Sequence, residues 1–209
     1  MYTPSSFRDN DPAVALQLIR DHNFGMLISN GEGSPLITHL PFMVESSEGK
    51  PVRLITHMAR ANKHWRSIED GQEVLSVFNG PHAYISPSWY ENRVTVPTWN
   101  YATVHVRGKA KLIHDGSKLR NIVTDLTHYM ESRVDSDWNL SEGEQTIPTE
   151  LKAIVGLEVD ISSCITKLKF NQNRSVEDQR NVITELEKSG LPGAEEMIII
   201  MKRNLNRKP

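Results

Sequence analysis

The sequence predicts a mainly β fold, in which an antiparallel barrel carries helices at its periphery. Six or seven segments of strand length follow one another with local turns between them, which favours an antiparallel barrel over alternating strands and helices. The glycine-rich turns of dinucleotide-binding folds and P-loops are missing, because residues 31–33 (GEG) lack the third glycine and the following helix. Since 209 residues suffice for one well-buried core and no repeat or linker divides them, we expect a single domain over residues 1–209.

The N-terminal part of the chain predicts one helix and then strands. Asp11 is suited to cap a helix whose first residue is Pro12, and an apolar face follows. Strands are expected over residues 25–29, 36–44 and 51–57. Residues 30–33 are typical of a hairpin turn, and residues 45–50 of a polar turn. Pro41 must lie at an edge, at a bulge or at the end of the pairing, since proline has no backbone N–H to donate.

The middle of the chain predicts more strands and one aromatic loop. A short helix is expected over residues 62–70, and Gly71 ends it. Gly80 and Pro81 are expected to break the strand that precedes them. Residues 86–100 show neither strand nor helix periodicity, so an ordered loop with packed aromatic side chains is expected there. Further strands are expected over residues 73–79, 83–85, 103–114 and 153–165.

Three further helices are predicted toward the C-terminus. Ser117 is expected to cap a helix with apolar residues at helical spacing. Ser175, with an acidic residue three positions later, resembles a capping box for a helix that Gly190 ends. A last helix is expected from about Pro192, so that C-terminal helices occupy about residues 175–205.

Composition and charge exclude several classes of protein. The formal charge is −2, from 24 Lys and Arg against 26 Asp and Glu, so the basic field of a protein that binds DNA directly is missing. No apolar run approaches the roughly 18 residues of a membrane-spanning helix, so no membrane association is expected. The lone Cys164 cannot form an internal disulfide or a cysteine-type metal site. Together with N-terminal residues that lack a signal-peptide pattern, this favours a cytoplasmic location.

Five stretches, in the same order along nearly the whole chain, resemble the PaiB family of FMN-binding negative transcriptional regulators. They are residues 1–7 (MYTPSSF), 38–42 (THLPF), 59–65 (ARANKHW), 80–90 (GPHAYISPSWY) with its continuation 96–101 (VPTWNY), and 169–174 (KFNQNR). In the last stretch Asn171 stands where the family has Ser, so the family's hydroxyl contact is not expected there. The resemblance implies an FMN-binding split β-barrel, related in fold to pyridoxamine-phosphate oxidase and flavin reductases, that works as a homodimer with FMN at the subunit interface.

The phosphate of FMN needs cations and N–H or O–H donors. The resemblance implies that these donors lie where the strand over residues 51–57 gives way to the short helix, whose N-terminus would add free N–H groups. Phosphate contacts are expected from Thr56, His57, Arg60, Asn62 and Lys63. Without the resemblance, the same residues fit a capped surface helix with solvated charges.

The flavin ring needs an edge of polar backbone groups. The expected edge is Thr38, His39, Leu40 and Pro41, where proline interrupts regular pairing and frees backbone groups. The side chain of His39 either contacts the ring or faces the pleat of the barrel.

Two further groups of residues are assigned to the flavin through the resemblance. Trp89 and Trp99 are expected to cover the flavin or to form the core of the dimer. A polar group is expected to reach the phosphate of the partner's FMN, or else to form an ordinary N-terminal helix turn. It comprises Lys169, Gln172, Asn173 and Arg174.

These expectations favour a flavin reductase-like oxidoreductase, in which FMN takes electrons from NADH or NADPH and no catalytic acid or base stands out. The alternative is a flavin-dependent negative transcriptional regulator of the PaiB type, for which direct DNA binding is doubtful on charge. A further alternative is a haem-binding split barrel. The eight histidines show none of the i, i+4 pairing with acidic residues that zinc hydrolases use, so no metal site is expected.

Overall fold

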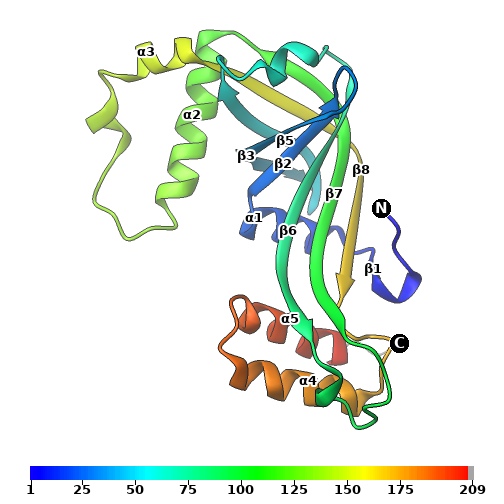
Figure 1. Ribbon diagram of the computed structural model, residues 1–209. Helices are drawn as coiled ribbons and strands as arrows, with labels where there is room; N and C mark the ends of the chain where they lie inside the picture. The colour runs from blue at the N-terminus through cyan, green and yellow to red at the C-terminus, as the bar shows by residue number, and fades with distance from the viewer. Residues whose placement is uncertain (207–209) are drawn as a thin grey trace. The chain divides into compact units, whose positions relative to one another are not determined.

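A computed structural model describes residues 1–206 of the chain, which forms two compact units (Figure 1). The barrel unit comprises Pro12–Phe78 and His105–Cys164. The terminal unit comprises Met1–Asp11, Asn79–Val104 and the chain from Ile165 onward. The expectation of a single domain over residues 1–209 remains a prediction, and residues 207–209 lie outside the described part.

Eight strands form one sheet in the order β3-β2-β6-β7-β8-β5-β4, and β1 pairs with β8. They are β1 (Arg8–Asp9), β2 (Phe24–Asn30), β3 (Pro35–Pro41), β4 (Met43–Ser47), β5 (Lys50–Ala59), β6 (Glu73–Ile85), β7 (Thr98–Ile113) and β8 (Ile154–Lys169). The pairings of β2 with β3 and β6, of β5 with β4 and β8, and of β1 with β8 are all antiparallel. The mainly β, antiparallel architecture expected from the sequence is confirmed.

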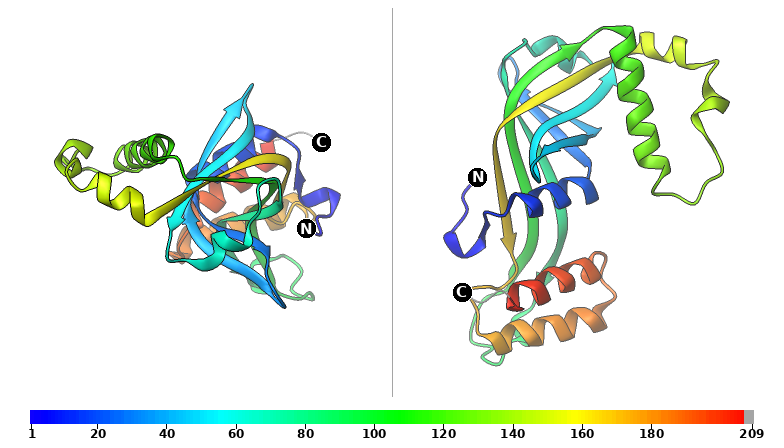
Figure 2. Two further views of the ribbon diagram at one scale, coloured as in Figure 1. Left: turned by 90° about the horizontal axis from the view of Figure 1, so that it is seen from above. Right: turned by 180° about the vertical axis from the view of Figure 1, so that it is seen from behind.

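The barrel unit buries alternate residues of its strands. On β5, Leu54, Thr56 and Met58 are buried on one face, because successive side chains of a strand point to opposite faces. The other face of β5 includes Ile55, which packs with Ile154 against a buried cluster of Ile113, Leu119 and Ile122. Two of these cluster residues belong to helix α2 (Gly116–Glu131), so the first turns of this helix pack against β5 (Figure 2).

Helix α1 (Pro12–Asp21) confirms the predicted proline start, and it contacts β4 and β5 through its apolar face. The predicted cap of α2 is wrong, because Asp115 caps that helix in place of Ser117. Its carboxylate accepts hydrogen bonds from the Lys118 amide at 2.9 Å and the Ser117 hydroxyl at 2.5 Å, and these bonds lower the pKa of Asp115. The remaining helical turns of this unit are α3 (Ile147–Glu150) and the 3-10 helices η2 (Lys63–Ser67), η4 (Leu140–Gly143) and η5 (Leu151–Ala153).

In the terminal unit, helices α4 (Val176–Ser189) and α5 (Ala194–Asn206) lie side by side (Figure 1). Ser175 caps α4 by accepting a hydrogen bond from the Asp178 amide, and Gly190 ends it with a φ of 62°. Both helices confirm the prediction for the C-terminal region. Two 3-10 helices, η1 (Ser5–Phe7) and η3 (Pro87–Trp89), complete this unit.

The predicted break at Gly80 and Pro81 is wrong, since β6 continues through both residues to Ile85. Gly80 and Pro81 are both buried, so the alternation of exposed and buried side chains slips by one residue there. Such an interruption lets a strand accommodate a residue without an N–H. The predicted loop also ends earlier than expected, because β7 begins at Thr98. No helix among residues 1–206 is long and apolar enough to cross a membrane.

Candidate functional site

The end of β5 and the turn that follows it carry a group of cations. Arg60, Lys63 and Arg66 lie within seven residues of one another, and Arg66 lies over the ring of Trp65 at 5.4 Å. No carboxylate pairs with any of the three among residues 1–206. The turn therefore presents positive charge that the chain itself does not neutralise.

Arg60 is fixed in place by backbone carbonyls rather than by an acidic side chain. Its Nε donates to the Lys152 carbonyl at 3.0 Å and its Nη2 to the Ile154 carbonyl at 2.9 Å. Its own amide donates to the Ala153 carbonyl at 2.7 Å, and its carbonyl accepts from the Trp65 indole at 2.9 Å. The guanidinium is thus held by carbonyl groups and not by a carboxylate, and its Nη1 makes no hydrogen bond within the described residues.

The helix expected over residues 62–70 is only the five-residue 3-10 helix η2. Asn62 caps it, and its Oδ1 accepts the hydrogen bond of the His64 amide at 3.0 Å. One of the first N–H groups is therefore already bound within the turn. Anion binding here would depend on the side-chain cations rather than on a helix dipole.

The residues predicted to hold the phosphate fall on both faces of β5. The hydroxyl of Thr56 faces the barrel interior and donates to the Pro41 carbonyl at 2.6 Å. His57 follows directly and therefore points to the opposite face, paired in register with Gly156. Its Nδ1 is buried without a partner in the described residues, and burial lowers the pKa of His57.

A chain of hydrogen bonds joins the predicted ring edge to the predicted phosphate turn. Asn62 Nδ2 donates to Thr38 Oγ1 at 3.1 Å, and Thr38 Oγ1 lies 2.8 Å from His64 Nδ1. His64 Nε2 lies 2.9 Å from the hydroxyl of Ser29 on β2. The sequence had assigned Thr38 and Asn62 to separate parts of the site, and the structure brings them together. It had not selected His64 and Ser29, although the alternation of β2 and the family-like stretch 59–65 contain them.

The predicted ring edge lies on β3, which pairs only with β2 among residues 1–206. Its second edge therefore has backbone N–H and C=O groups that no strand takes up. Leu40 is buried and Pro41 ends the strand, as expected for a residue without an N–H. His39 is exposed, and its ring stacks on that of Phe24 at 6.1 Å.

In the terminal unit, the four residues predicted to reach a partner's FMN already have different local environments. Lys169 donates to the hydroxyl of Thr98, and Gln172 bonds the Phe170 amide and the Leu168 carbonyl. Arg174 donates to Thr95 Oγ1 at 2.8 Å and lies over the ring of Tyr90 at 4.6 Å, whereas Asn173 is exposed. The aromatic loop and the turn over residues 169–174 are thus bound to each other.

The surroundings of Asn171, which stands where the family has Ser, suit an asparagine. Its backbone has a φ of 64°, a conformation that asparagine tolerates better than most side chains. Its Nδ2 donates to the hydroxyl of Tyr90 at 2.7 Å, and its Oδ1 accepts from the buried amide of Asn100. Asn171 therefore forms a buried polar cluster with the start of β7 and the loop before it.

The two predicted aromatic covers differ in exposure. Trp89 is half-buried in η3, whereas Trp99 is 54% exposed and lies 6.3 Å from the ring of His82 and 6.1 Å from that of Tyr84. Trp99 and His82 also line a hollow of about 350 Å³. Trp99 is therefore available to a ligand or to another chain, while Trp89 is partly occupied within its own unit.

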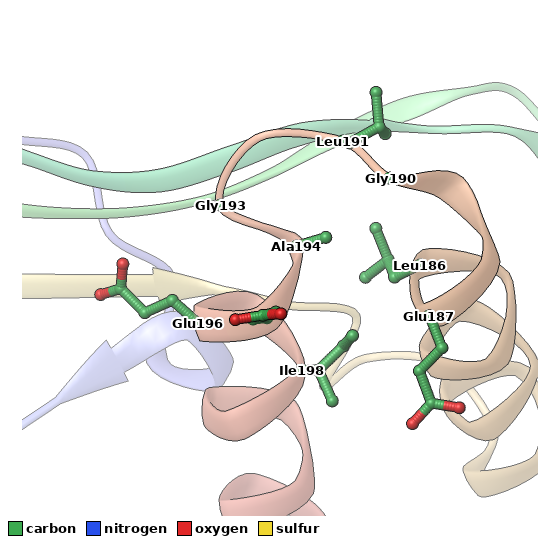
Figure 3. A pocket seen from close by; sticks show the side chains of 9 residues that line it. Leu186, Glu187, Gly190, Leu191, Gly193, Ala194, Glu196 and Ile198 are labelled. Carbon is green, nitrogen blue, oxygen red and sulfur yellow. The ribbon is translucent and has the colours of Figure 1, made fainter.

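A second hollow, of about 570 Å³, lies between α4 and α5 (Figure 3). Its charged residues are the carboxylates Glu187, Glu195 and Glu196, and its apolar wall includes Leu186 and Ile198. A lining of this charge repels a phosphate group. This hollow therefore does not fit FMN.

These features define a split β-barrel, the fold class expected from the sequence. The FAD and heme binding protein from Mycobacterium smegmatis superposes with a TM-score of 0.59 at 12% identity, over 88% of this chain and 80% of that one. The flavocytochrome Anf3 from Azotobacter vinelandii gives a TM-score of 0.54 at 15% identity, over 77% and 67% of the two chains. At such identities the likeness shows the fold alone.

The chain belongs to the family described as "Putative FMN-binding domain", whose model matches residues 1–163. It is 32% identical over 207 residues to the protease synthase and sporulation protein PAI 2 of Bacillus subtilis (strain 168), covering 99% of both chains. It is also 36% identical over 118 residues to the uncharacterized protein YKL070W of Saccharomyces cerevisiae, covering 54% of this chain and 64% of that protein. The resemblance to the PaiB family is confirmed.

Proposed function

We propose that this protein binds FMN, with the phosphate at the cationic turn of Arg60, Lys63 and Arg66 and the ring along residues 38–41 of β3. The observation that carries this proposal is the group of three cations without a carboxylate partner among residues 1–206. A phosphate dianion is the part of FMN that such a group attracts most strongly. The family description supports the same cofactor.

Within the turn, each predicted residue has a distinct role in the proposal. Arg60 is held by carbonyls and offers Nη1, while Lys63 is exposed and offers a mobile ammonium. Asn62 shapes the turn, because both ends of its amide are bound to His64 and Thr38. Thr56 holds the carbonyl at the end of β3, and His57 supports the strand from its other face.

Lys63→Ala tests the phosphate assignment, with Lys50→Ala as the matched control. Both lysines are exposed, and Lys50 begins the same strand β5 whose far end leads to the turn. Loss of Lys63 raises the Kd for FMN about fivefold, roughly 1 kcal/mol, and leaves riboflavin binding unchanged, since riboflavin carries no phosphate. Lys50→Ala changes neither. Arg60→Ala has a larger effect in the same direction. Equal losses of affinity for FMN and for riboflavin would show that the phosphate does not bind at this turn.

The proposal places FMN at the interface of a homodimer. Lys169, Gln172, Asn173 and Arg174 would approach the phosphate of the partner's FMN, and Trp89 and Trp99 would cover the ring of that FMN. The exposure of Trp99 and the single-sided pairing of β3 support an interface in which another chain completes the site. Light scattering on the purified protein is expected to give twice the mass of 23.7 kDa, and a stable monomer would contradict the dimer.

Bound FMN supplies hydride and electron transfer, so the proposed activity is oxidation of NADH or NADPH with transfer to a small acceptor. The residues of this chain bind and orient the cofactor. Purified protein with added FMN is expected to oxidise NADH or NADPH faster than free FMN does. Equal rates with free and protein-bound FMN would contradict a reductase.

A regulatory role of the PaiB type is the second candidate, and the full-length similarity to PAI 2 favours it. The formal charge of −2 argues against direct DNA contact, so regulation through a partner protein is the form we propose. A promoter fragment that migrates unchanged at low salt fits this form, whereas a steep salt-dependent shift would indicate direct binding. A Soret band on haem titration would instead favour haem as the ligand.

A further inference from the structure

The hydrogen-bonded chain Ser29–His64–Thr38–Asn62 links three separate elements of the barrel unit. Ser29 lies on β2, Thr38 on β3, and Asn62 and His64 in the turn that contains η2. Ser29 and His64 are each 4% exposed, so their contacts are shielded from water. Hydrogen bonds of this kind fix the relative positions of the segments that carry them.

The orientation of each group follows from its neighbours. Asn62 Oδ1 accepts from the His64 amide, which directs Nδ2 toward Thr38. Burial lowers the pKa of His64, so its ring is neutral near pH 7, with one nitrogen donating and the other accepting. Both hydroxyls, those of Ser29 and Thr38, are therefore held by the ring whichever nitrogen carries the hydrogen.

Two members of these hydrogen bonds, Thr38 and Asn62, lie in the two parts of the proposed flavin site. Thr38 begins the segment proposed to line the ring, and Asn62 lies between the cations Arg60 and Lys63. These two residues are 24 positions apart in the sequence and meet only through their side chains. FMN joins its ring to its phosphate through one ribityl chain, so the two subsites must keep one separation.

We propose that His64, anchored by Ser29, is a positioning residue that sets the distance between the phosphate turn and the ring edge. The inference rests on the proposed function. It goes beyond that function because neither residue needs to touch the flavin. A histidine that served only the core would affect the unfolding free energy and leave the preference for FMN over riboflavin unchanged.

The amides of asparagine and glutamine separate the two contacts of His64. An asparagine amide reaches about as far as Nδ1 and keeps a partner for Thr38, whereas a glutamine amide reaches about as far as Nε2 and keeps a partner for Ser29. His64→Gln is therefore expected to raise the Kd for FMN at least tenfold and the Kd for riboflavin less than twofold. His64→Asn keeps Thr38 and loses only the Ser29 anchor, so it is expected to raise the Kd for FMN about threefold to tenfold.

Ser29→Ala and Ser76→Ala form a matched pair for the anchor. Ser76 lies on the adjacent strand β6, opposite Leu27 of β2, and is 0% exposed. Its hydroxyl has no partner within the described residues. Ser29→Ala is expected to raise the Kd for FMN about threefold to tenfold, and Ser76→Ala to leave it within twofold.

The measurements are titrations of each full-length variant with FMN and with riboflavin, at a temperature well below its unfolding midpoint. Unchanged FMN affinity in all His64 variants, with lowered unfolding midpoints, would overturn the positioning role and leave a structural histidine. Equal losses for FMN and riboflavin would overturn the spacing role as well. A wild-type protein that binds neither flavin would instead refute the proposed function, and the inference with it.

Discussion

The barrel unit and the terminal unit each contain one buried polar cluster, and the two clusters are satisfied in different ways. In the barrel unit, every side chain of the Ser29–His64–Thr38–Asn62 chain has a partner at hydrogen-bond distance. In the terminal unit, Tyr90 and Asn100 each form a hydrogen bond with Asn171, but the buried Oδ1 of Asn100 has no partner among residues 1–206. Asn171 also carries a left-handed backbone.

The comparison indicates what each cluster contributes. The barrel cluster contains His64, whose pKa is lowered by burial, and it links two proposed subsites. The terminal cluster of Tyr90, Asn100 and Asn171 contains no histidine, and it holds the loop over residues 86–97 against the turn over residues 169–174. We therefore expect changes in the terminal cluster to affect mainly stability, and changes in the barrel cluster to affect stability, pH dependence and ligand affinity together.

The largest expected effect is that of Asn171→Ala. It removes both side-chain bonds, leaves the Asn100 amide buried without a partner, and places a Cβ-bearing residue without a polar side chain at a φ of 64°. Together these changes lower the unfolding free energy by about 3 kcal/mol. Asn171→Gly removes the same bonds but suits the backbone, so its loss is smaller by about 1 kcal/mol. Equal losses in urea unfolding would show that the backbone conformation contributes nothing.

His64→Ala is expected to cost about 2 kcal/mol of unfolding free energy, since it leaves the hydroxyls of Ser29 and Thr38 without their shared partner. Urea unfolding at pH 8 measures this loss without protonation of other histidines. A change below about 0.5 kcal/mol would mean that water replaces the ring, and the contrast between the two clusters would then disappear.

The next expected difference between the two clusters is in the pH dependence of the unfolding free energy. Burial lowers the pKa of His57, His64 and His105, all of which lie in the barrel unit. Because the pKa of these histidines is lowered in the folded state, the unfolded state binds more protons than the folded state once the pH falls below the ordinary histidine pKa of 6.5. Stability is therefore fully present above about pH 6.5 and decreases as the pH falls below it.

His64→Gln is expected to flatten this dependence between pH 7.5 and 5.5, because it removes one of the buried titrating groups. Asn171→Gly serves as the control and is expected to leave the slope of the unfolding free energy against pH unchanged. An unaltered slope in His64→Gln would assign the pH dependence to His57 and His105 alone.

The smallest expected effect is that of Ser76→Ala. It removes a buried hydroxyl without a partner in the described residues, so the unfolding free energy stays within about 0.5 kcal/mol of the wild type or rises slightly. A loss of unfolding free energy above about 1 kcal/mol would indicate that a water binds the Ser76 hydroxyl. Ser76→Ala would then no longer serve as the control for Ser29→Ala.

Local signals in the sequence predicted the elements well where one residue decides the outcome. The proline start of α1, the Ser175 cap and the Gly190 end are all of this kind. Asp115 and Ser117 both suit a cap by residue type, and only the backbone shows that Asp115 lies just outside the helix. Gly80 and Pro81 predict a break by their local preferences, whereas their burial within β6 depends on tertiary packing that the sequence does not show.

The sequence predicts which residues belong to the candidate site, but it does not predict the contacts between them. The stretches 38–42 and 59–65 were recognised, yet the contact between Thr38 and Asn62 joins residues that no local pattern relates. His64 looked like one histidine among eight until its two hydroxyl partners were known. Likewise, the opposite directions of Thr56 and His57 follow from the strand, and only the packing shows which of them faces the interior.

A crystal structure of the full-length protein with FMN tests the central claim most directly. The predicted result is electron density for the phosphate within hydrogen-bond distance of Arg60 Nη1 or Lys63 Nζ, with the flavin ring along the free edge of residues 38–41. Density for FMN elsewhere, or an empty turn at saturating FMN, would contradict the account.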